Sequence, residues 1–176
     1  NENSFVEISN GFRDTQTADM SLKNLTVPYL FRSGVYFERK LTLAPGTSIL
    51  FDNNSFIEFE SSATFVANGT SLLPITFSHI DGTEGAWQGI FLYSGLANSM
   101  QYCVIEHGGS YYNYPCTLVI GEDARLTIQN STIRNTTGYG VVKFNSGTIS
   151  STSLTFSNCD LGNVYNYDED VISPSL

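Results

Sequence analysis

The segment TFSH (residues 76–79) returns three times further along the chain, each time as a short alternation of apolar and polar residues closed by His or Asn. The copies are VIEH (104–107), TIRN (132–135) and TFSN (155–158), so the successive steps are 28, 28 and 23 residues. A second segment, GIFL (89–92), returns as TLVI (117–120) and GVVK (140–143) with steps of 28 and 23 residues. Two separate strand tracks that keep one register predict the stacked coils of a parallel β-solenoid.

The same period of two continues upstream of these repeats. Phe56, Glu58 and Glu60 alternate with Ile57 and Phe59, which predicts strands with an apolar inner side and carboxylates outside. Between the short strands lie turn sequences rich in Gly and Asn, two residue types that tolerate the positive φ of sharp corners. These turns are APGT (44–47), ANGT (67–70), IDGT (80–83) and SGT (146–148).

We therefore expect an all-β chain folded as a right-handed parallel β-helix (solenoid) of about five or six coils, since parallel crossovers are right-handed. The β-helix is expected over residues 28–162, after an N-terminal cap segment (1–27) that leads into the first coil. An acidic C-terminal tail (163–176) is expected either to fray or to form a partial cap. Four side chains of the first track should stack inside consecutive coils: Phe77, Ile105, Ile133 and Phe156.

Composition narrows the classes of partner. The net charge is −9 and only eight residues are Lys or Arg, which argues against nucleic acid because a phosphate-binding surface needs clustered cations. No apolar run approaches the ~20 residues that a membrane-spanning helix needs. Many Ser, Thr, Asn and Gly residues, with 14% charged residues, favour an extracellular or cell-surface β protein.

Three cysteines, Cys103, Cys116 and Cys159, give an odd count that cannot be fully paired within one chain. Cys103 takes an inward position of the repeat, so a buried free thiol is the favoured interpretation. A bridge between Cys103 and Cys116 remains an alternative that would clip the loop between them. The spacings do not match those of a zinc site.

Five motifs carry a resemblance to a known family: LTLAPGTSILF (41–51), ATFVANGT (63–70), PITF (74–77), GAWQGIFL (85–92) and MQYCVIEHGG (100–109). Together they resemble the secreted or lipid-anchored right-handed parallel β-helix proteins of bacteria, especially Bacteroidetes, which share the pectate-lyase-like superfamily fold. The resemblance covers about residues 27–160. It indicates the fold and leaves the function open, because this superfamily includes lyases, hydrolases, adhesins and members of no known activity.

A lyase is one function that the resemblance allows. Polysaccharide lyases with this fold place Ca²⁺-binding carboxylates beside an Arg or Lys base on the outside of one sheet. Glu106, Arg134 and Ser157 fall at one outward repeat position, and adjacent coils are ~4.8 Å apart. The favoured interpretation is a surface ion pair between Glu106 and Arg134. Segments typical of polygalacturonases are not found.

His79 and His107 occupy the repeat position that Asn135 and Asn158 occupy later. This could indicate a catalytic or metal-binding pair. Because Asn and His can both hydrogen-bond to the backbone at turns, a structural ladder is favoured, and His107 is retained as a candidate because it borders the loop described next.

The 28-residue repeat needs about five residues more than the 23-residue one, and the extra residues fall in the segment 108–115. A similar excess lies at 81–87. Insertions in solenoids gather on one side and often form the binding face. Tyrosines concentrate there, and exposed aromatic rings suit the apolar faces of sugars. The candidate ligand-binding residues are Tyr93, Glu106, His107, Tyr111, Tyr112 and Tyr114; the rival explanation is packing between the two insertions.

The sequence thus favours a non-catalytic module that binds a polysaccharide or a cell-surface partner through these loops and tyrosines. No catalytic residue, metal site or cofactor is assigned; Ca²⁺ is the ion that a lyase would use. The alternatives are a fragment of a polysaccharide lyase or glycoside hydrolase and a structural stalk of a larger surface protein.

Overall fold

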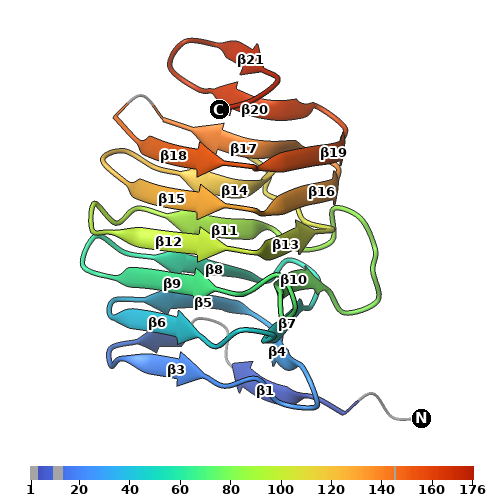
Figure 1. The fold of residues 1–176 in the computed structure, drawn as a ribbon. Coiled ribbons are helices and arrows are strands. Elements are labelled where there is room, and N and C mark those ends of the chain that lie inside the picture. Colours follow the sequence, from blue (N-terminus) through green and yellow to red (C-terminus); the bar gives the residue numbers. More distant parts are fainter. Residues whose placement is uncertain (1–3, 10–13, 145) are drawn as a thin grey trace.

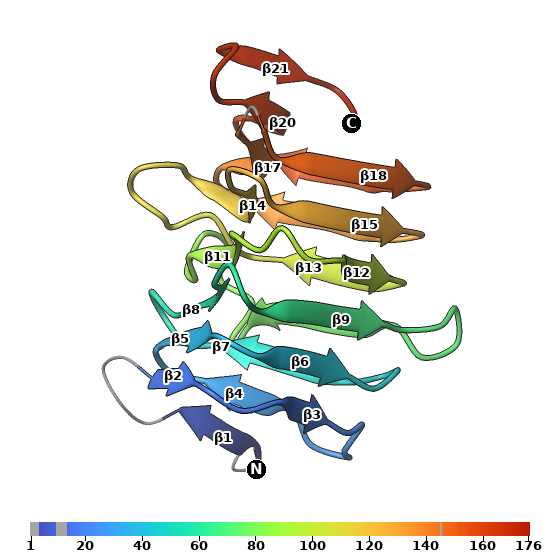
Figure 2. The same cartoon turned by 90° about the vertical axis from the view of Figure 1, so that its left-hand side faces the viewer.

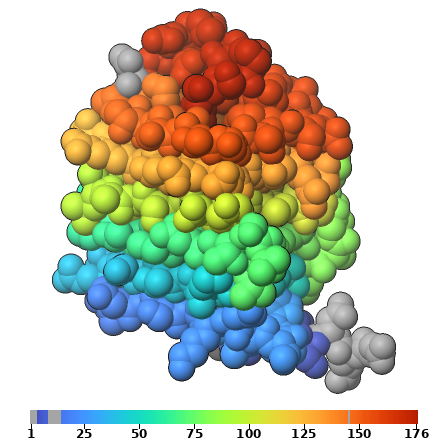
Figure 3. All heavy atoms as spheres, in the orientation of Figure 1, coloured from blue at the N-terminus to red at the C-terminus, as the bar shows by residue number. Residues whose placement is uncertain are grey.

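A computed structural model of the chain describes residues 4–9, 14–144 and 146–176. Its strands stack along one axis, from β1 at the N-terminal end to β21 at the C-terminal end (Figure 1). In the space-filling view, successive coils form parallel bands from blue to red (Figure 3). The strands belong to three sheets that run along this axis.

We call the sheets A, B and C in the order in which each coil visits them. Sheet A contains β1 (Val6–Ser9), β4 (Tyr29–Phe31), β7 (Ser48–Phe51), β10 (Ile75–His79), β13 (Cys103–Glu106), β16 (Thr132–Thr136) and β19 (Thr155–Cys159). Sheet B contains β2 (Asp14–Gln16), β5 (Gly34–Phe37), β8 (Phe56–Phe59), β11 (Gly89–Leu92), β14 (Cys116–Ile120), β17 (Tyr139–Lys143), β20 (Gly162–Asn166) and β21 (Val171–Ser173). Sheet C contains β3 (Met20–Leu22), β6 (Lys40–Leu43), β9 (Thr64–Asn68), β12 (Asn98–Gln101), β15 (Arg125–Gln129) and β18 (Thr148–Thr152).

The expected right-handed parallel β-helix is confirmed, and so are both repeat tracks. Phe77 pairs with Ile105, Ile105 with Ile133 and Ile133 with Phe156 on consecutive strands of sheet A. On sheet B, Ile90, Leu118 and Val141 pair in the same way. The first three residues of the sheet A track are fully buried, whereas Phe156 is half-buried because it lies in the last coil.

The stack begins earlier than the sequence indicated. β1, β2 and β3 lie within the segment expected to be a cap (1–27), and they pair in parallel with β4, β5 and β6. Sheet A has seven strands and sheet C has six, so the stack contains six complete coils, in agreement with the expected five or six, and a partial seventh coil formed by β19 and β20. Ile8, Met20 and Leu22 of this coil pack on the core, but β2 (DTQ) is entirely polar, so the first coil leaves little trace in the hydrophobic pattern.

The C-terminal segment also differs from a frayed tail. β20 still belongs to the parallel stack, and residues 163–166 lie within it. β21 then turns back and pairs with β20 in antiparallel orientation, above the last coil in Figures 1 and 2. It covers the open edge of sheet B, as a partial cap does, and protected edges resist pairing with other chains.

The three cysteines are free thiols. Cys103 is buried inside the coil, where its thiol donates to the carbonyl oxygen of Ala67 at 3.1 Å. Cys116 is buried on the other side of sheet B, packed with Phe91, Val119 and Val142. The alternative bridge between Cys103 and Cys116 is therefore absent.

These thiols should react slowly in the folded protein. Burial raises the pKa of Cys103 to about 12, raises that of Cys116 well above its usual range and raises that of the half-buried Cys159 to about 11. Because the thiolate is the nucleophile, we expect slow labelling by a chromogenic disulfide reagent near pH 8, led by Cys159. Denaturant should expose all three thiols; fast labelling of Cys103 or Cys116 without denaturant would contradict the packing.

Candidate functional site

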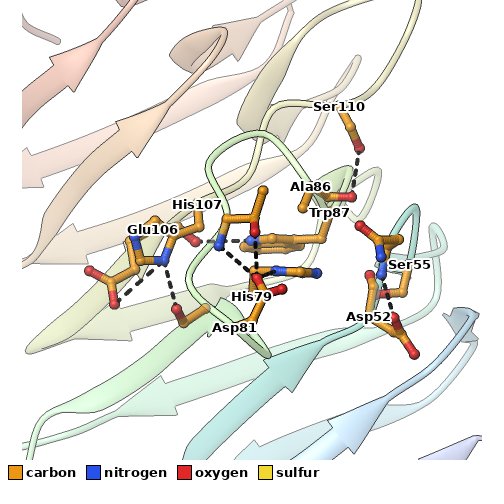
Figure 4. Close-up of polar contacts among 12 residues, drawn as sticks. Asp52, Ser55, His79, Asp81, Ala86, Trp87, Glu106, His107 and Ser110 are labelled. Carbon is orange, nitrogen blue, oxygen red and sulfur yellow. Dashed lines mark hydrogen bonds and ion pairs between the residues drawn. The ribbon is translucent and has the colours of Figure 1, made fainter.

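The two insertions of the sequence form the corner between sheets A and B, and their backbones stack on each other. Trp87 forms a parallel bridge with Gly108. The carbonyl oxygen of Trp87 accepts hydrogen bonds from the backbone N–H groups of Gly109 at 3.0 Å and Ser110 at 3.2 Å, and Ala86 N–H donates to His107 O at 3.2 Å. The β-ladder thus continues through both loops, which fixes the corner in place (Figure 4).

Trp87 is the centre of this corner. Its side chain is fully buried and its ring stacks on Phe51 at 3.9 Å between centroids, with an interplanar angle of 3°. Its indole Nε1–H donates to the backbone oxygen of Glu106 at 2.9 Å. The ring therefore ties one coil to the next by packing and by a hydrogen bond.

The two histidines lie below and beside this ring (Figure 4). His79 Nδ1 is 2.7 Å from Asp81 Oδ1, and His79 Nε2 is buried with no hydrogen-bond partner among the described residues. A neutral His79 ring therefore carries its proton on Nδ1 and donates it to Asp81. Hydrogen bonds from Thr83, and then from His79, lower the pKa of Asp81 to about 2. His107 Nδ1 shares a hydrogen bond of 2.9 Å with Ser78 Oγ.

The two histidines differ in backbone conformation. His107 has φ 65°, as do its repeat equivalents Asn135 at 53° and Asn158 at 52°, whereas His79 is not among the residues with positive φ. Asn158 Nδ2 donates to Asn135 Oδ1 at 3.0 Å. His107 thus occupies the start of a left-handed ladder that Asn fits well.

We expect His107→Asn to change the free energy of unfolding by less than about 1 kcal/mol, because Asn accepts the left-handed backbone and the loss is one hydrogen bond. His107→Val should be clearly worse, because a β-branched residue is strained at this φ. Urea denaturation of both variants tests this. Equal losses for Asn and Val would show that the left-handed backbone does not decide the residue at this position.

The predicted ion pair on the outside of sheet A is confirmed. Arg134 Nε lies 2.7 Å from Glu106 Oε2, and Ser157 is in register with Arg134 on the next strand. The Arg134 side chain is 46% exposed, so water screens the pair and it contributes at most about 1 kcal/mol. In the ranges that the structure describes, no group of three or more His, Cys, Asp or Glu side chains is arranged to hold a metal ion.

The predicted tyrosines lie on the outside of sheet B. The loop 107–115 projects on that side in Figure 2. Tyr111 packs edge-on against Phe91 at 4.9 Å between ring centroids, Tyr114 is half-buried beside it, and Tyr112 is 96% exposed. Glu106 and His107 lie on the sheet A side of the corner, so the structure does not bring all six candidates to one surface.

Tyr111 and Tyr114 belong to a longer aromatic surface along sheet B. The outer aromatic face, as we define it, consists of Tyr36, Phe56, Phe91, Tyr93, Tyr111, Tyr114, Phe144, Tyr165 and Tyr167. Its rings touch in sequence: Tyr36–Phe56 at 5.3 Å, Phe56–Phe91 at 5.7 Å, Tyr111–Tyr114 at 6.1 Å, Tyr114–Phe144 at 5.3 Å, Tyr114–Tyr167 at 4.9 Å and Tyr165–Tyr167 at 6.2 Å between centroids. Tyr111 and Tyr114 are tilted by 41°, and the other five pairs are edge-to-face, a favoured geometry of aromatic contacts.

Carboxylates accompany these rings. Glu58 stands between Tyr36 and Phe91 in one outward row of sheet B. Burial, and then the charge of Glu58, raises the pKa of Tyr93 well above its usual range. At the C-terminal end, the hydroxyl of Tyr165 donates to Asp170 Oδ1 at 2.8 Å, which raises the pKa of Tyr165 to about 12.

Sequence reasoning missed five residues of this face: Tyr36, Phe91, Phe144, Tyr165 and Tyr167. The sequence signal that could have found them is the alternation of inward and outward side chains along each strand. Ile57, Ile90 and Val141 point inward, so the neighbouring Phe56, Phe91 and Val142 must point outward.

The family comparison agrees with this architecture. A family model described as "Right handed beta helix region" matches residues 4–170. The chain belongs to this right-handed β-helix family. Searches of curated proteins and of solved structures give no significant match. The family match fits a pectate-lyase-like fold, and it includes the first coil, which the repeat pattern alone had not revealed. Among the described residues of this β-helix, no helix is long and apolar enough to cross a membrane.

Proposed function

We propose that this β-helix is a non-catalytic extracellular module that binds glycan through the outer aromatic face and the loop 107–115. The observation that carries the proposal is the chain of touching aromatic rings on the outside of sheet B. Its rings are partly accessible: Tyr93 is 37% and Tyr167 40% exposed. Exposed rings next to hydrogen-bonding groups suit a sugar, which has apolar C–H faces and hydroxyl edges.

The tyrosines of the loop have different roles in this proposal. Tyr112 is the contact residue, because its side chain is almost fully exposed and no ring of the described residues packs against it. Tyr111 and Tyr114 support the face, because they pack against Phe91, Phe144 and Tyr167. Extra loop residues cost closure entropy without adding to the core, and a fully exposed ring in such a loop is better explained by contact than by folding.

We expect Tyr112→Ala and Tyr167→Ala each to weaken glycan binding by about tenfold, the effect of about 1.4 kcal/mol. Leu72→Ala is the matched control, because Leu72 is 88% exposed on a turn between sheets C and A. It should leave binding unchanged. Affinity electrophoresis in gels that contain single polysaccharides, with thermal melting of each variant, measures both properties.

The same protein preparations distinguish the proposed binding module from an enzyme and from a structural stalk. Release of unsaturated or reducing ends from a polysaccharide, with or without Ca²⁺, would show an enzyme and contradict the non-catalytic proposal. Wild-type protein that binds no glycan in a broad array would also contradict it and favour the structural stalk. A loss of stability in Tyr112→Ala would show that this side chain supports the fold.

A further inference from the structure

A small cleft interrupts the outer aromatic face where sheet B ends and the chain turns towards sheet C. It encloses about 240 Å³ and is lined by Tyr93, Gly121, Glu122 and Phe144. These positions follow one another in register: Gly121 N–H donates to Leu92 O at 2.8 Å and Phe144 N–H to Ile120 O at 2.9 Å. Two aromatic rings therefore flank a glycine that lies between them on consecutive coils.

Gly121 makes this cleft possible. A Cβ atom on Gly121 would lie 2.3 Å from Cδ1 of Tyr93, so the Tyr93 ring lies directly over the glycine. Gly121 is not among the glycines with positive φ, so its backbone does not require glycine. Glycine is needed at position 121 because a side chain there would occupy the space that the Tyr93 ring fills next to the cleft.

The size of the cleft suits one sugar ring. On the same measure one water molecule needs roughly 10–15 Å³, so the 240 Å³ of this cleft leaves room for a ligand of the size of a single pyranose. The rings of Tyr93 and Phe144 offer apolar surfaces, and the Glu122 carboxylate accepts hydrogen bonds from hydroxyls. A glycan chain lying along the face would place one residue here.

The charges beside the cleft decide which sugars fit. In the outward rows of sheet B between Gly34 and Tyr167, the charged side chains are Glu38, Glu58 and Glu60. Glu122 adds a carboxylate at the cleft itself. Lys143 is in register with the inward-facing Ile120 and lies outside these rows. Lys143 places its Nζ 3.5 Å from the backbone oxygen of Phe144, but the charged residue that lines the cleft is Glu122, so a uronic acid would bring its carboxylate towards that of Glu122.

We propose that this cleft is a single-residue subsite for an uncharged pyranose within a neutral glycan, and that it rejects uronic acids. The inference rests on the proposed glycan-binding function and adds the substrate class. The carboxylate of a uronic acid in the cleft and the carboxylate of Glu122 would repel each other, and dissolved salt weakens this repulsion. Rejection of acidic glycans is the opposite of what the lyase alternative needs.

The test uses the full chain and isothermal titration with four hexasaccharides: cellohexaose, xylohexaose, mannohexaose and hexagalacturonic acid. We expect a neutral hexasaccharide to bind at least about tenfold more tightly than hexagalacturonic acid. Gly121→Ala should weaken that binding by about tenfold or more at unchanged melting temperature, because the added methyl displaces the Tyr93 ring. Tyr93→Ala is the second variant should Gly121→Ala fold poorly, and Leu72→Ala is the control.

Glu122→Lys tests the charge argument. It should reverse the preference: the affinity for hexagalacturonic acid should rise, and that for the neutral ligand should fall because its hydroxyls lose the carboxylate acceptor. Equal or tighter wild-type binding of hexagalacturonic acid would overturn the inference while the glycan-binding function stands. The inference is also overturned, and the glycan-binding function stands, if both Gly121→Ala and Tyr93→Ala bind the neutral hexasaccharide as tightly as the wild type. If no hexasaccharide binds and the glycan array is also empty, the proposed function fails and the subsite fails with it.

Discussion

Replacing Trp87 with Ala should lower the free energy of unfolding by about 3–5 kcal/mol, the range measured for large aromatic side chains removed from protein cores. The ring is fully buried and stacks on Phe51 at 3.9 Å between centroids. Its removal would leave a cavity between two coils that rigid strands on three sides cannot close. The indole hydrogen bond to Glu106 O, at 2.9 Å, would also be lost.

Trp87→Phe separates these two contributions. Phenylalanine keeps most of the stacking on Phe51 but cannot donate to Glu106 O, so its loss should be clearly smaller, about 1–2 kcal/mol for the unpaired oxygen and the smaller ring. Urea denaturation followed by far-ultraviolet circular dichroism measures both variants. A loss below about 1 kcal/mol for Trp87→Ala would contradict the role of the ring in joining the coils.

The strand register could be predicted because the apolar residues of each coil must face the same narrow core. Phe77, Ile105 and Ile133 recur at fixed spacing, and a slip of one residue would turn each of them outward. The same register placed Glu106 beside Arg134, and their ion pair follows from it. Long-range contacts in a solenoid are thus readable from local spacing, which is not true of most β folds.

The first coil and the outer aromatic face could not be predicted in the same way. The polar strand β2 joins the stack through backbone pairing with β5, and backbone hydrogen bonds have no sequence signature. The aromatic face was obscured for another reason. Phe91 lies within GIFL between two inward residues, and an apolar run of this kind does not show which side chain points outward.

Asn98 is a buried polar residue in an inward row of sheet C. As the first residue of β12, it is in register with Leu126 of β15, and a polar residue at a strand start suggests solvent. In the structure Asn98 is 2% exposed. Its side chain replaces an apolar neighbour in the inward row and hydrogen-bonds to backbone in three consecutive coils.

We expect Asn98→Ala to lower the free energy of unfolding by about 3 kcal/mol, because each buried group left without a partner costs about 1–3 kcal/mol. Asn98 Oδ1 accepts from Phe65 N–H at 2.8 Å, while Nδ2 donates to the backbone oxygens of Ser94 and Leu96 at 3.1 Å and of Arg125 at 2.9 Å. Alanine removes the acceptor and both donors at once, and the interior offers no water to replace them.

Two further variants make this expectation specific. Asn98→Asp keeps an acceptor for Phe65 N–H but points a second oxygen at carbonyl oxygens, so at neutral pH it should be at least as destabilising as Asn98→Ala. Ser99→Ala, one residue along on the outward side of β12, should change stability by no more than about 0.5 kcal/mol. If Asn98→Ala and Ser99→Ala lose similar amounts in urea denaturation, the amide does not join the coils. A large loss confined to position 98 means that one buried amide holds β9, β12 and β15 in register, beside the turn that carries Gly121 and the proposed sugar subsite.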